Sequence, residues 1–278
     1  MKKISRRSFM AAAAVSVAAL ALTACGGSAS SAASSVASSA ASSEAVSSAA
    51  AADLTTVEAG KLTMATNAAF PPYEMTTDAG EFEGIDVDTA KAIAEKLGLE
   101  LQIDDMDFDA ALLSVQQGKA DIVMAGVTVT DERKAVMDFS DSYATGIQSI
   151  IVPNDSDIAS PDDLAGKKIG TQRGTTGYIY CSDDFGDENV VAYDDGLTAV
   201  QALNNGQVDA VVIDNAPAQE FVAANPGLKV LDTSYAEEDY AIGVAKGSAL
   251  EDAVNKALEE LKADGTLQAI VDKYINAN

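Results

Sequence analysis

Hydrophobic residues between positions 61 and 125 alternate between two spacings, one typical of strands and one typical of helices. The pattern predicts strands at residues 61–66, 99–103 and 121–125, and helices at 85–97 and 110–117. Gly98 and Gly118 follow the two helices at the position where a glycine commonly ends one. Strands separated by helices indicate a sheet with parallel strands and helices on its faces. The pattern therefore predicts an α/β protein.

The second half of the chain repeats this arrangement. Strands are expected at 168–172, 190–193, 208–213 and 239–244, and helices at 175–181, 197–204, 216–223, 248–263 and 267–275. Segments 116–126 and 204–214 also share a pattern, which runs from a helix end through Gly and Asp to an apolar strand. Either each half contains its own copy of one helix–strand unit, or both use a join that is common in α/β proteins.

Open α/β sheets bind ligands beyond the carboxyl ends of their strands, so residues at those ends are candidate binding residues. Ala125, Gly126 and Thr128 end or follow the first of the two similar strands, and Asp214 ends the second. Asp214 could neutralise an ammonium group, or it could cap the helix expected from Ala216.

Arg133 lies one turn inside a short helix whose start is marked by Thr130, a good N-cap residue. An arginine near a helix start is unfavourable for the helix dipole, so another interaction should explain it. It could clamp a carboxylate with two hydrogen bonds, or it could form a surface ion pair with a nearby acid.

A turn at residues 172–177 follows a strand and opens a helix, which is the geometry of an anion site. It contains Gln172, Thr175 and Thr176, lacks the Walker lysine and spacing, and could also be an ordinary strand-to-helix turn. Phe70 and Phe108 could form the walls of a pocket or belong to the core. Together with Arg133 and Asp214, these features suit a free amino acid as ligand.

Composition narrows the classes of function. The 278 residues include 18 Lys+Arg, 43 Asp+Glu, no His and no Trp, with a formal net charge of −25. This acidic excess argues against nucleic-acid binding. The absence of His excludes Ser-His-Asp and Cys-His nucleophile pairs and His-ligated zinc. With only Cys25 and Cys181, neither a cysteine-rich metal site nor a disulfide scaffold is expected, and we predict no metal and no cofactor.

The first 52 residues have the composition of an export signal and a tether. A basic cluster at 2–7 precedes an uncharged run at 8–24, which predicts a signal peptide over residues 1–24. The closing Leu22-Thr23-Ala24-Cys25 resembles a lipobox, so Cys25 is the expected site of lipidation. Ser5–Met10 resembles a twin-arginine motif, although ordinary Sec signals also carry arginine pairs. Residues 26–52 contain 11 Ser and 11 Ala, so residues 25–52 are expected to form a lipidated tether.

The body of the chain resembles the polar amino-acid-binding proteins of ATP-driven importers, solute-binding family 3, whose relatives include glutamine- and histidine-binding proteins. The resemblance extends over residues 61–275. It is carried by the stretches Ala65–Glu74, Gly84–Asp88, Ala125–Arg133, Asp138–Tyr143 and Gly174–Thr176.

This resemblance implies a type II periplasmic-binding-protein fold with two lobes, each a mixed, mostly parallel sheet flanked by helices. Lobe 1 would comprise residues 53–143 and 241–278, and lobe 2 residues 148–236, with hinges at 143–148 and 236–240. The expected function is the extracytoplasmic binding component of an amino-acid ABC importer. The expected partners are a free amino acid and the permease and ATPase subunits. We expect a monomer, anchored by lipid at the outer face of the cytoplasmic membrane.

The resemblance also implies roles for the candidate residues. Arg133 would bind the ligand α-carboxylate together with the backbone N–H groups of Thr128 and Thr176. The α-ammonium would be bound by Asp214, by the carbonyl oxygen of Gly126 and by the Thr128 hydroxyl.

The expected ligand side chain follows from departures within this resemblance. Phe70 and Phe108 would sandwich the side chain. Asn67 stands where glutamine- or basic-ligand-binding relatives often have Asp, and Gln172 stands near the place of a lysine in the glutamine-binding relative. A neutral polar ligand is therefore expected, while the nearby Arg173 keeps an acidic ligand open.

Two other functions fit a fold of this kind. One is an enzyme resembling cyclohexadienyl or arogenate dehydratases, which needs an acid–base group at the leaving hydroxyl. The absence of His disfavours this class without excluding it, because a Glu could serve, and we expect no enzymatic activity. The other is a binding protein that delivers its ligand to a chemoreceptor.

Overall fold

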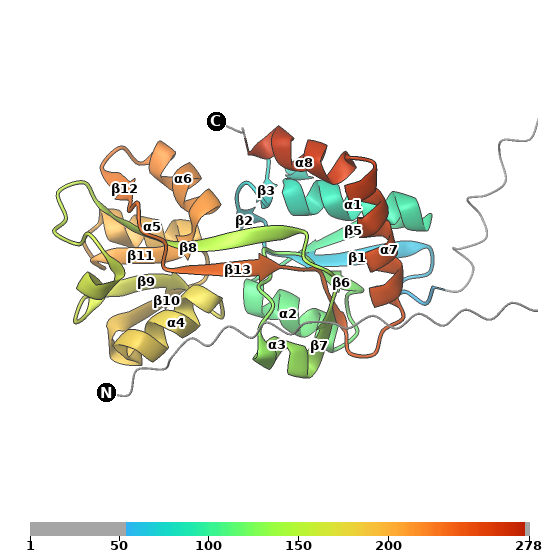
Figure 1. Ribbon diagram of the computed structural model, residues 1–278, viewed down its shortest axis with the longest axis horizontal. Coiled ribbons are helices and arrows are strands. Elements are labelled where there is room, and N and C mark those ends of the chain that lie inside the picture. Colours follow the sequence, from blue (N-terminus) through green and yellow to red (C-terminus); the bar gives the residue numbers. More distant parts are fainter. Residues whose placement is uncertain (1–53, 276–278) are drawn as a thin grey trace, which may run out of the picture. The chain divides into compact units, whose positions relative to one another are not determined.

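The computed structural model describes residues 54–275, which form the α/β fold expected from the sequence (Figure 1). The predicted signal peptide, Cys25 and the tether lie outside the described residues. Everything described below belongs to the compact unit that the described residues form within residues 44–278. No helix among the described residues is long and apolar enough to cross a membrane.

The first large sheet has the strand order β5-β1-β6-β14-β7. Its strands are β1 (Lys61–Thr66), β5 (Glu100–Asp105), β6 (Ile122–Val123), β7 (Met137–Phe139) and β14 (Gly243–Ala245). Its helices are α1 (Ile85–Leu97), α2 (Phe108–Gln116), α3 (Asp131–Val136), α7 (Leu250–Ala263) and α8 (Thr266–Tyr274). Three short strands, which the sequence pattern did not reveal, form a separate small sheet: β2 (Ala69–Phe70), β3 (Glu74–Thr76) and β4 (Phe82–Glu83).

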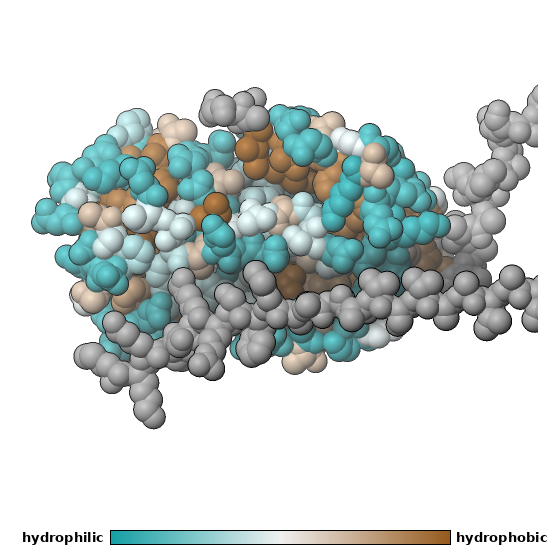
Figure 2. Space-filling view, viewed as in Figure 1, coloured by the Kyte–Doolittle hydropathy of each residue, from teal (hydrophilic) through white to brown (hydrophobic). Residues whose placement is uncertain are grey.

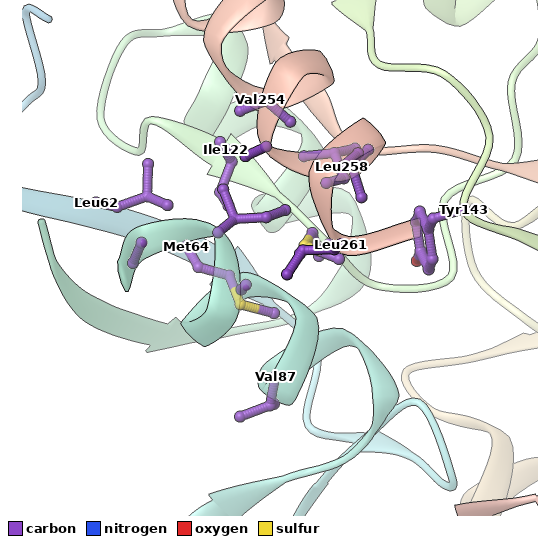
Figure 3. Packing of buried hydrophobic residues seen from close by; sticks show 14 of the residues in the cluster. Leu62, Met64, Val87, Ile122, Tyr143, Val254, Leu258 and Leu261 are labelled. Carbon is purple, nitrogen blue, oxygen red and sulfur yellow. The ribbon is translucent and has the colours of Figure 1, made fainter. Parts of the chain in front are cut away.

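Alternate residues of β1 face opposite sides of this sheet, and helices cover both sides. Leu62 and Met64 pack with residues of α1 and α7, and Figure 3 shows them beside Val254 and Leu258. Ala65 faces the other way and packs with residues of α2. This two-sided burial leaves every residue of β1 except Lys61 buried, including the polar Thr63 and Thr66.

The second large sheet has the strand order β10-β9-β11-β8-β12, and β13 pairs with β8 beyond this path. Its strands are β8 (Ala144–Pro153), β9 (Ile169–Gln172), β10 (Val190–Tyr193), β11 (Ala210–Asp214), β12 (Leu228–Val230) and β13 (Ala236–Tyr240). Its helices are α4 (Thr176–Phe185), α5 (Gly196–Asn204) and α6 (Asn215–Ala224), with short 3-10 turns η1 (Pro161–Leu164) and η2 (Asp187–Asn189). Cys181 lies in the core beside this sheet and is a free thiol.

Both sheets are mixed. In the first, β1 is parallel to β5 and β6, whereas β14 is antiparallel to β6 and β7. In the second, β9 is parallel to β10 and β11, whereas β8 is antiparallel to β11, β12 and β13. In the first sheet the antiparallel strand β14 comes late in the chain, whereas in the second sheet the antiparallel strand β8 precedes the parallel strands β9, β10 and β11.

Residues 239–244 do not form the single strand that their alternation predicts. Strand β13 ends at Tyr240 and pairs with β8, whereas β14 begins at Gly243 and pairs with β6 and β7. Alternation of apolar and polar residues indicates that a segment is extended, but it does not indicate which strand the segment pairs with. One alternating pattern therefore spans two strands that belong to different sheets.

The two similar segments occupy equivalent places in their sheets. Each runs from a helix end through a glycine with positive φ, Gly118 or Gly206, into the strand that pairs with β1 or β9. Asp121 accepts a hydrogen bond from the Thr63 N–H at 2.7 Å, and Asp209 accepts one from the Lys168 N–H at 2.8 Å. The helix–strand unit is therefore present once beside each sheet.

Strands β8 and β13 lie side by side and run between the two sheets (Figure 1). Their antiparallel register pairs Ala144 with Tyr240 at one end and Gln148 with Ala236 at the other. On the face shown in Figure 2 most of the surface is hydrophilic, as expected for a strongly acidic chain.

Candidate functional site

All eleven residues proposed from the sequence as ligand contacts line one cavity. They are Asn67, Phe70, Phe108, Ala125, Gly126, Thr128, Arg133, Gln172, Thr175, Thr176 and Asp214. The cavity is also lined by Glu74, Gln148, Val212, Ile213 and Tyr240, which the sequence reading did not single out. The structure thus brings together residues that lie up to about 170 positions apart in sequence.

Side chains from the two sheets meet around this cavity. Gln172, at the end of β9, donates from Nε2 to Asn67 Oδ1 at 2.9 Å. Arg133 donates from Nη2 to the Gly174 carbonyl at 3.1 Å. The hydroxyl oxygens of Thr128 and Thr176 lie 3.4 Å apart. These contacts bridge the strand ends of one sheet and those of the other.

Arg133 is buried at the cavity, with 8% of its surface exposed. Thr130 caps α3 by accepting from the Arg133 N–H at 3.2 Å, as predicted. The guanidinium donates from Nη1 to the Thr128 carbonyl at 2.8 Å and lies 5.3 Å from the centre of the Phe108 ring. Burial lowers the pKa of Arg133, and the negative charge of Glu238 opposes this effect.

Arg133 forms no ion pair within 4.0 Å among residues 54–275, so the alternative of a surface ion pair is wrong. A buried guanidinium without a carboxylate partner is costly unless another anion satisfies it. The position of Arg133 at the cavity wall therefore suits it to bind an anionic group of a ligand.

Asp214 has a structural role and also lines the cavity. Its Oδ1 accepts from the Ala216 N–H at 3.1 Å and caps α6, which was one of the two interpretations of this residue. Its Oδ2 accepts from the Ile147 N–H of β8 at 2.7 Å. Burial raises the pKa of Asp214 to about 6. A cation in the cavity would favour the charged carboxylate and lower this pKa.

Gly126 allows the backbone to approach the cavity closely. Its φ is +55°, and a Cβ at this position would lie 2.9 Å from Phe70 Cε1. The Gly126 N–H donates to Asp86 Oδ2 at 3.0 Å, and the Tyr143 hydroxyl donates to Asp86 Oδ1 at 2.7 Å. Asp86 thus links the backbone at the cavity to the start of β8.

Glu74 lines the cavity as a buried carboxyl group. Burial raises the pKa of Glu74 well above its ordinary value, and the neighbouring Asp86 raises it further. Burial also raises the pKa of Asp86 to about 6. Burial therefore favours the neutral form of Glu74, which would reduce the negative charge at the cavity.

The predicted anion turn has the expected local geometry. Thr175 caps α4 by accepting from the Tyr178 N–H at 3.3 Å, and its hydroxyl donates to the Gln172 carbonyl at 2.8 Å. Thr176 is buried at the first position of the helix. Arg173, by contrast, is exposed, lies 3.6 Å from Asp194 and does not line this cavity. An acidic ligand was an alternative only because Arg173 is close to Gln172 in sequence, and the position of Arg173 outside the cavity removes that reason.

The sequence pattern did not reveal Gln148 and Tyr240 because their strands, β8 and β13, pair with each other across about 90 residues of sequence. It did not reveal Glu74 because β3 is only three residues long. Gln148 and Ser149 are polar residues between Ile147 and Ile150 of β8, and Gln148 is 5% exposed. A buried polar residue needs a partner, so an amide flanked by apolar strand residues was the available signal. Glu74 and Tyr240 gave no comparable local signal.

Residues 62–277 match the model of the bacterial extracellular solute-binding proteins, family 3. The L-cystine-binding protein TcyJ of Escherichia coli (strain K12) is 33% identical over 80% of this chain and 85% of its own length. A probable histidine-binding protein of Neisseria gonorrhoeae is 34% identical over 95% of this chain and 94% of its own length. A solved structure titled as an ancestral arginine-binding protein bound to glutamine is 42% identical, with a TM-score of 0.74, and covers 78% of this chain and 98% of that one.

These matches agree on the class of protein. The family and the relatives named above are solute-binding proteins rather than enzymes, so the dehydratase alternative has no support. The similar solved structure, at a TM-score of 0.74, has the two-lobed binding-protein fold expected from the sequence. The chain belongs to the bacterial extracellular solute-binding proteins, family 3.

Proposed function

We propose that this protein is the extracytoplasmic binding component of an ABC importer and captures a free L-amino acid in the cavity between its two sheets. The observation that carries the proposal is the cavity itself, where an unpaired buried Arg133 and the carboxyl group of Asp214 line the same space. An amino acid carries one anionic and one cationic group, which these two residues would bind. The relatives named as cystine-, histidine- and arginine-binding proteins support this class of ligand.

The ligand side chain that we propose is neutral and polar. Asn67 and Gln172 form an amide pair in the cavity wall, and burial raises the pKa of Glu74, which favours its neutral form. Amide groups both donate and accept, so this region would suit a side-chain amide better than a cation. The similar ancestral arginine-binding protein, solved bound to glutamine, supports a site that accepts such a ligand. Arginine and histidine are the competing ligands, because relatives carry those names.

The remaining parts of the proposal concern assembly and location. Strands β8 and β13 contain the predicted hinges at 143–148 and 236–240, and we propose that bending there opens and closes the cavity between lobe 1 (53–143 and 241–278) and lobe 2 (148–236). We further propose that lipidated Cys25 anchors a monomer to the outer face of the cytoplasmic membrane, where it meets the permease and ATPase subunits.

A thermal-shift screen of the twenty amino acids tests this function, because a ligand that binds only the folded state raises Tm. We expect L-glutamine or another neutral polar amino acid to give the largest shift. Arg133→Ala should abolish the shift, since a charge-assisted hydrogen bond contributes about 1.5–3 kcal/mol and Arg133 can form two to one carboxylate. The matched control is Arg173→Ala, because Arg173 is exposed and outside the cavity.

The outcomes separate the parts of the proposal. If no amino acid shifts the Tm of the wild-type protein, amino-acid binding is wrong. If arginine or histidine gives the largest shift, the class is right and the proposed side chain is wrong. If the amino acid raises the Tm of the Arg133→Ala and Arg173→Ala variants by the same amount, Arg133 does not bind the ligand carboxylate.

A further inference from the structure

Glu238 is a buried carboxylate on β13 that contacts side chains of the cavity wall. Only 6% of its surface is exposed. Its Oε2 accepts hydrogen bonds from Thr128 Oγ1 at 3.1 Å and from Gln148 Nε2 at 2.9 Å. Both of these partners line the cavity, whereas Glu238 itself lies behind them. Figure 1 shows β13 running between the two sheets beside β8, which carries Gln148.

Tyr180 of α4 also lies close to this carboxylate. Burial and the neighbouring Glu238 charge raise the pKa of Tyr180 to about 12. Glu238 is therefore surrounded by groups from three elements, namely the loop after β6, strand β8 and helix α4. Both hydrogen bonds fall on Oε2, whereas Glu238 Oε1 is buried and has no hydrogen-bond partner among residues 54–275, so Thr128 and Gln148 are the donors that the structure gives this carboxylate.

The chemistry of a carboxylate fixes how these neighbours are oriented. An ionised carboxylate only accepts hydrogen bonds, so Thr128 must use its single hydroxyl hydrogen toward Glu238. Thr128 Oγ1 then acts as an acceptor, with one lone pair toward the Thr176 hydroxyl at 3.4 Å and the other available to a further donor. In the same way the Gln148 amide must direct its NH₂ group toward Glu238, and its Oε1 is left facing elsewhere.

An unsatisfied atom marks the other side of the Gln148 amide. Gln148 Oε1 is buried and has no hydrogen-bond partner among residues 54–275. Gln148 lines the cavity, and its Oε1 lies toward Gly177 near the start of α4, where a Cβ would be 2.8 Å from this atom. A buried acceptor without a donor is costly, and a ligand ammonium that reached it would remove this cost.

We propose that Glu238 is a positioning residue that turns Thr128 and Gln148 into hydrogen-bond acceptors for the ammonium group of the ligand. This inference rests on the proposed amino-acid-binding function. An ammonium has three N–H donors and no acceptor, and Thr128 Oγ1, Gln148 Oε1 and the Asp214 carboxylate supply acceptors only. A hydroxyl in place of the ammonium would offer one donor and leave the other acceptors unsatisfied. The arrangement therefore selects α-amino acids over the matching α-hydroxy acids.

The Glu238→Gln variant tests the proposal, because glutamine keeps the shape but adds an NH₂ donor that allows Thr128 and Gln148 to reverse. Calorimetry would compare L-glutamine with 2-hydroxyglutaramic acid, and L-arginine with argininic acid. We expect the preference of the wild-type protein for the amino acid over the hydroxy acid to fall by about 10-fold or more in the variant. If Glu238 had only a structural role, the variant would lose affinity for the amino acid and for the hydroxy acid equally, and the ratio of the two affinities would stay unchanged.

The matched control is Glu237→Gln, which makes the same change at the adjacent, exposed residue of β13 and should leave the preference intact. An unchanged preference in Glu238→Gln, in a wild-type background that binds the amino acid, would overturn the inference but not the proposed function. A wild-type protein that binds neither amino acid would overturn both.

A second measurement covers the case in which Glu238→Gln does not fold. A crystal structure of the wild-type protein with L-glutamine or L-arginine should place the ligand nitrogen within hydrogen-bond distance of Thr128 Oγ1 and Gln148 Oε1. A ligand nitrogen more than about 4 Å from both oxygens would contradict the proposal.

Discussion

At the scale of single residues, the cavity combines very few charges with many neutral polar groups. Arg133 is the only Lys or Arg that lines it, and Asp214 and Glu74 are its only acids. Burial raises the pKa of both acids, so each carboxyl group is neutral more readily than in water. The preference of the cavity for a charged or a neutral ligand side chain then depends on the neutral residues, chiefly Asn67 and Gln172.

Asn67→Asp should shift ligand preference toward arginine. The new carboxylate can still accept from Gln172 Nε2, which now lies 2.9 Å from Asn67 Oδ1, and it adds a negative charge beside the cavity. A single charge-assisted hydrogen bond contributes about 1.5–3 kcal/mol, so the ratio of arginine to glutamine affinity should rise by about 10-fold or more. Calorimetric Kd values for both ligands measure this ratio.

The control for this change is Asp109→Asn, which removes a charge from α2 at a residue outside the cavity lining. A ratio that is unchanged by Asn67→Asp would show that the side chain of the ligand does not reach this residue.

At the scale of elements, β8 and β13 carry both the connection between the sheets and part of the cavity wall. Tyr240 ends β13, is 1% exposed, and lines the cavity. Its ring lies against the backbone of β8 at Gly146, where a Cβ would be 2.4 Å from Tyr240 Cζ. The absence of a side chain at Gly146 therefore allows the two strands to hold this ring in place.

Gly146→Ala should destabilise the protein and weaken ligand binding together. The methyl group forces the buried Tyr240 ring to move, and overpacking of this kind costs about 1–3 kcal/mol. Denaturant unfolding measures the loss of stability, and calorimetry measures the loss of affinity. Gly227→Ala is the matched control, since its Cβ would meet no atom within 4 Å. Equal stability of the two variants would show that the contact with Tyr240 is unimportant.

At the scale of the whole molecule, buried carboxyl groups couple stability to pH. Asp86 and Asp214 both have pKa values near 6 because of burial, against an ordinary value of 3.8. Between these values the folded state holds protons that the unfolded state has released. Lowering the pH through 6 toward 4 therefore stabilises the folded state. Acids with a lowered pKa, such as Asp264 with a pKa of about 2, stabilise the folded state when ionised, and this contribution is lost only below about pH 4.

Without ligand, Tm should be higher at pH 5 than at pH 7.5. Ligand binding should show the opposite dependence, because an ammonium favours ionised Asp214 and only about one tenth of Asp214 is ionised one pH unit below its pKa. The Kd should therefore be about 10-fold weaker at pH 5. Calorimetry at the two pH values measures Kd, and scanning calorimetry measures Tm.

Asp214→Asn should reduce both pH dependences, whereas Asp264→Asn, on the surface, should leave them unchanged in this range. A Tm that falls between pH 7.5 and 5 in the wild-type protein would contradict the assignment of raised pKa values to these buried acids.

The sequence by itself determined the types and order of most elements. The periodicity in residues 61–125 predicted β1, α1, β5 and α2 with ends that agree with the structure within a few residues, although β6 is shorter than its apolar run. Helix starts such as Thr130 were also visible, because a cap bonds within its own turn. The resemblance to a known family supplied the residues of the cavity; the spacing of these residues alone left each of them with a structural alternative.

The tertiary structure decided what depends on contacts between distant segments. It divided residues 239–244 between two sheets, gave Asp214 a cap and a place in the cavity, and exposed Arg173 to solvent. It also placed Glu238 against Thr128, 110 residues earlier in the chain. Hydrogen bonds of this kind leave no periodic pattern in the sequence, because each of the two segments contributes only a single polar residue. The sequence thus determined which groups are available, and only folding determined which of them face one another.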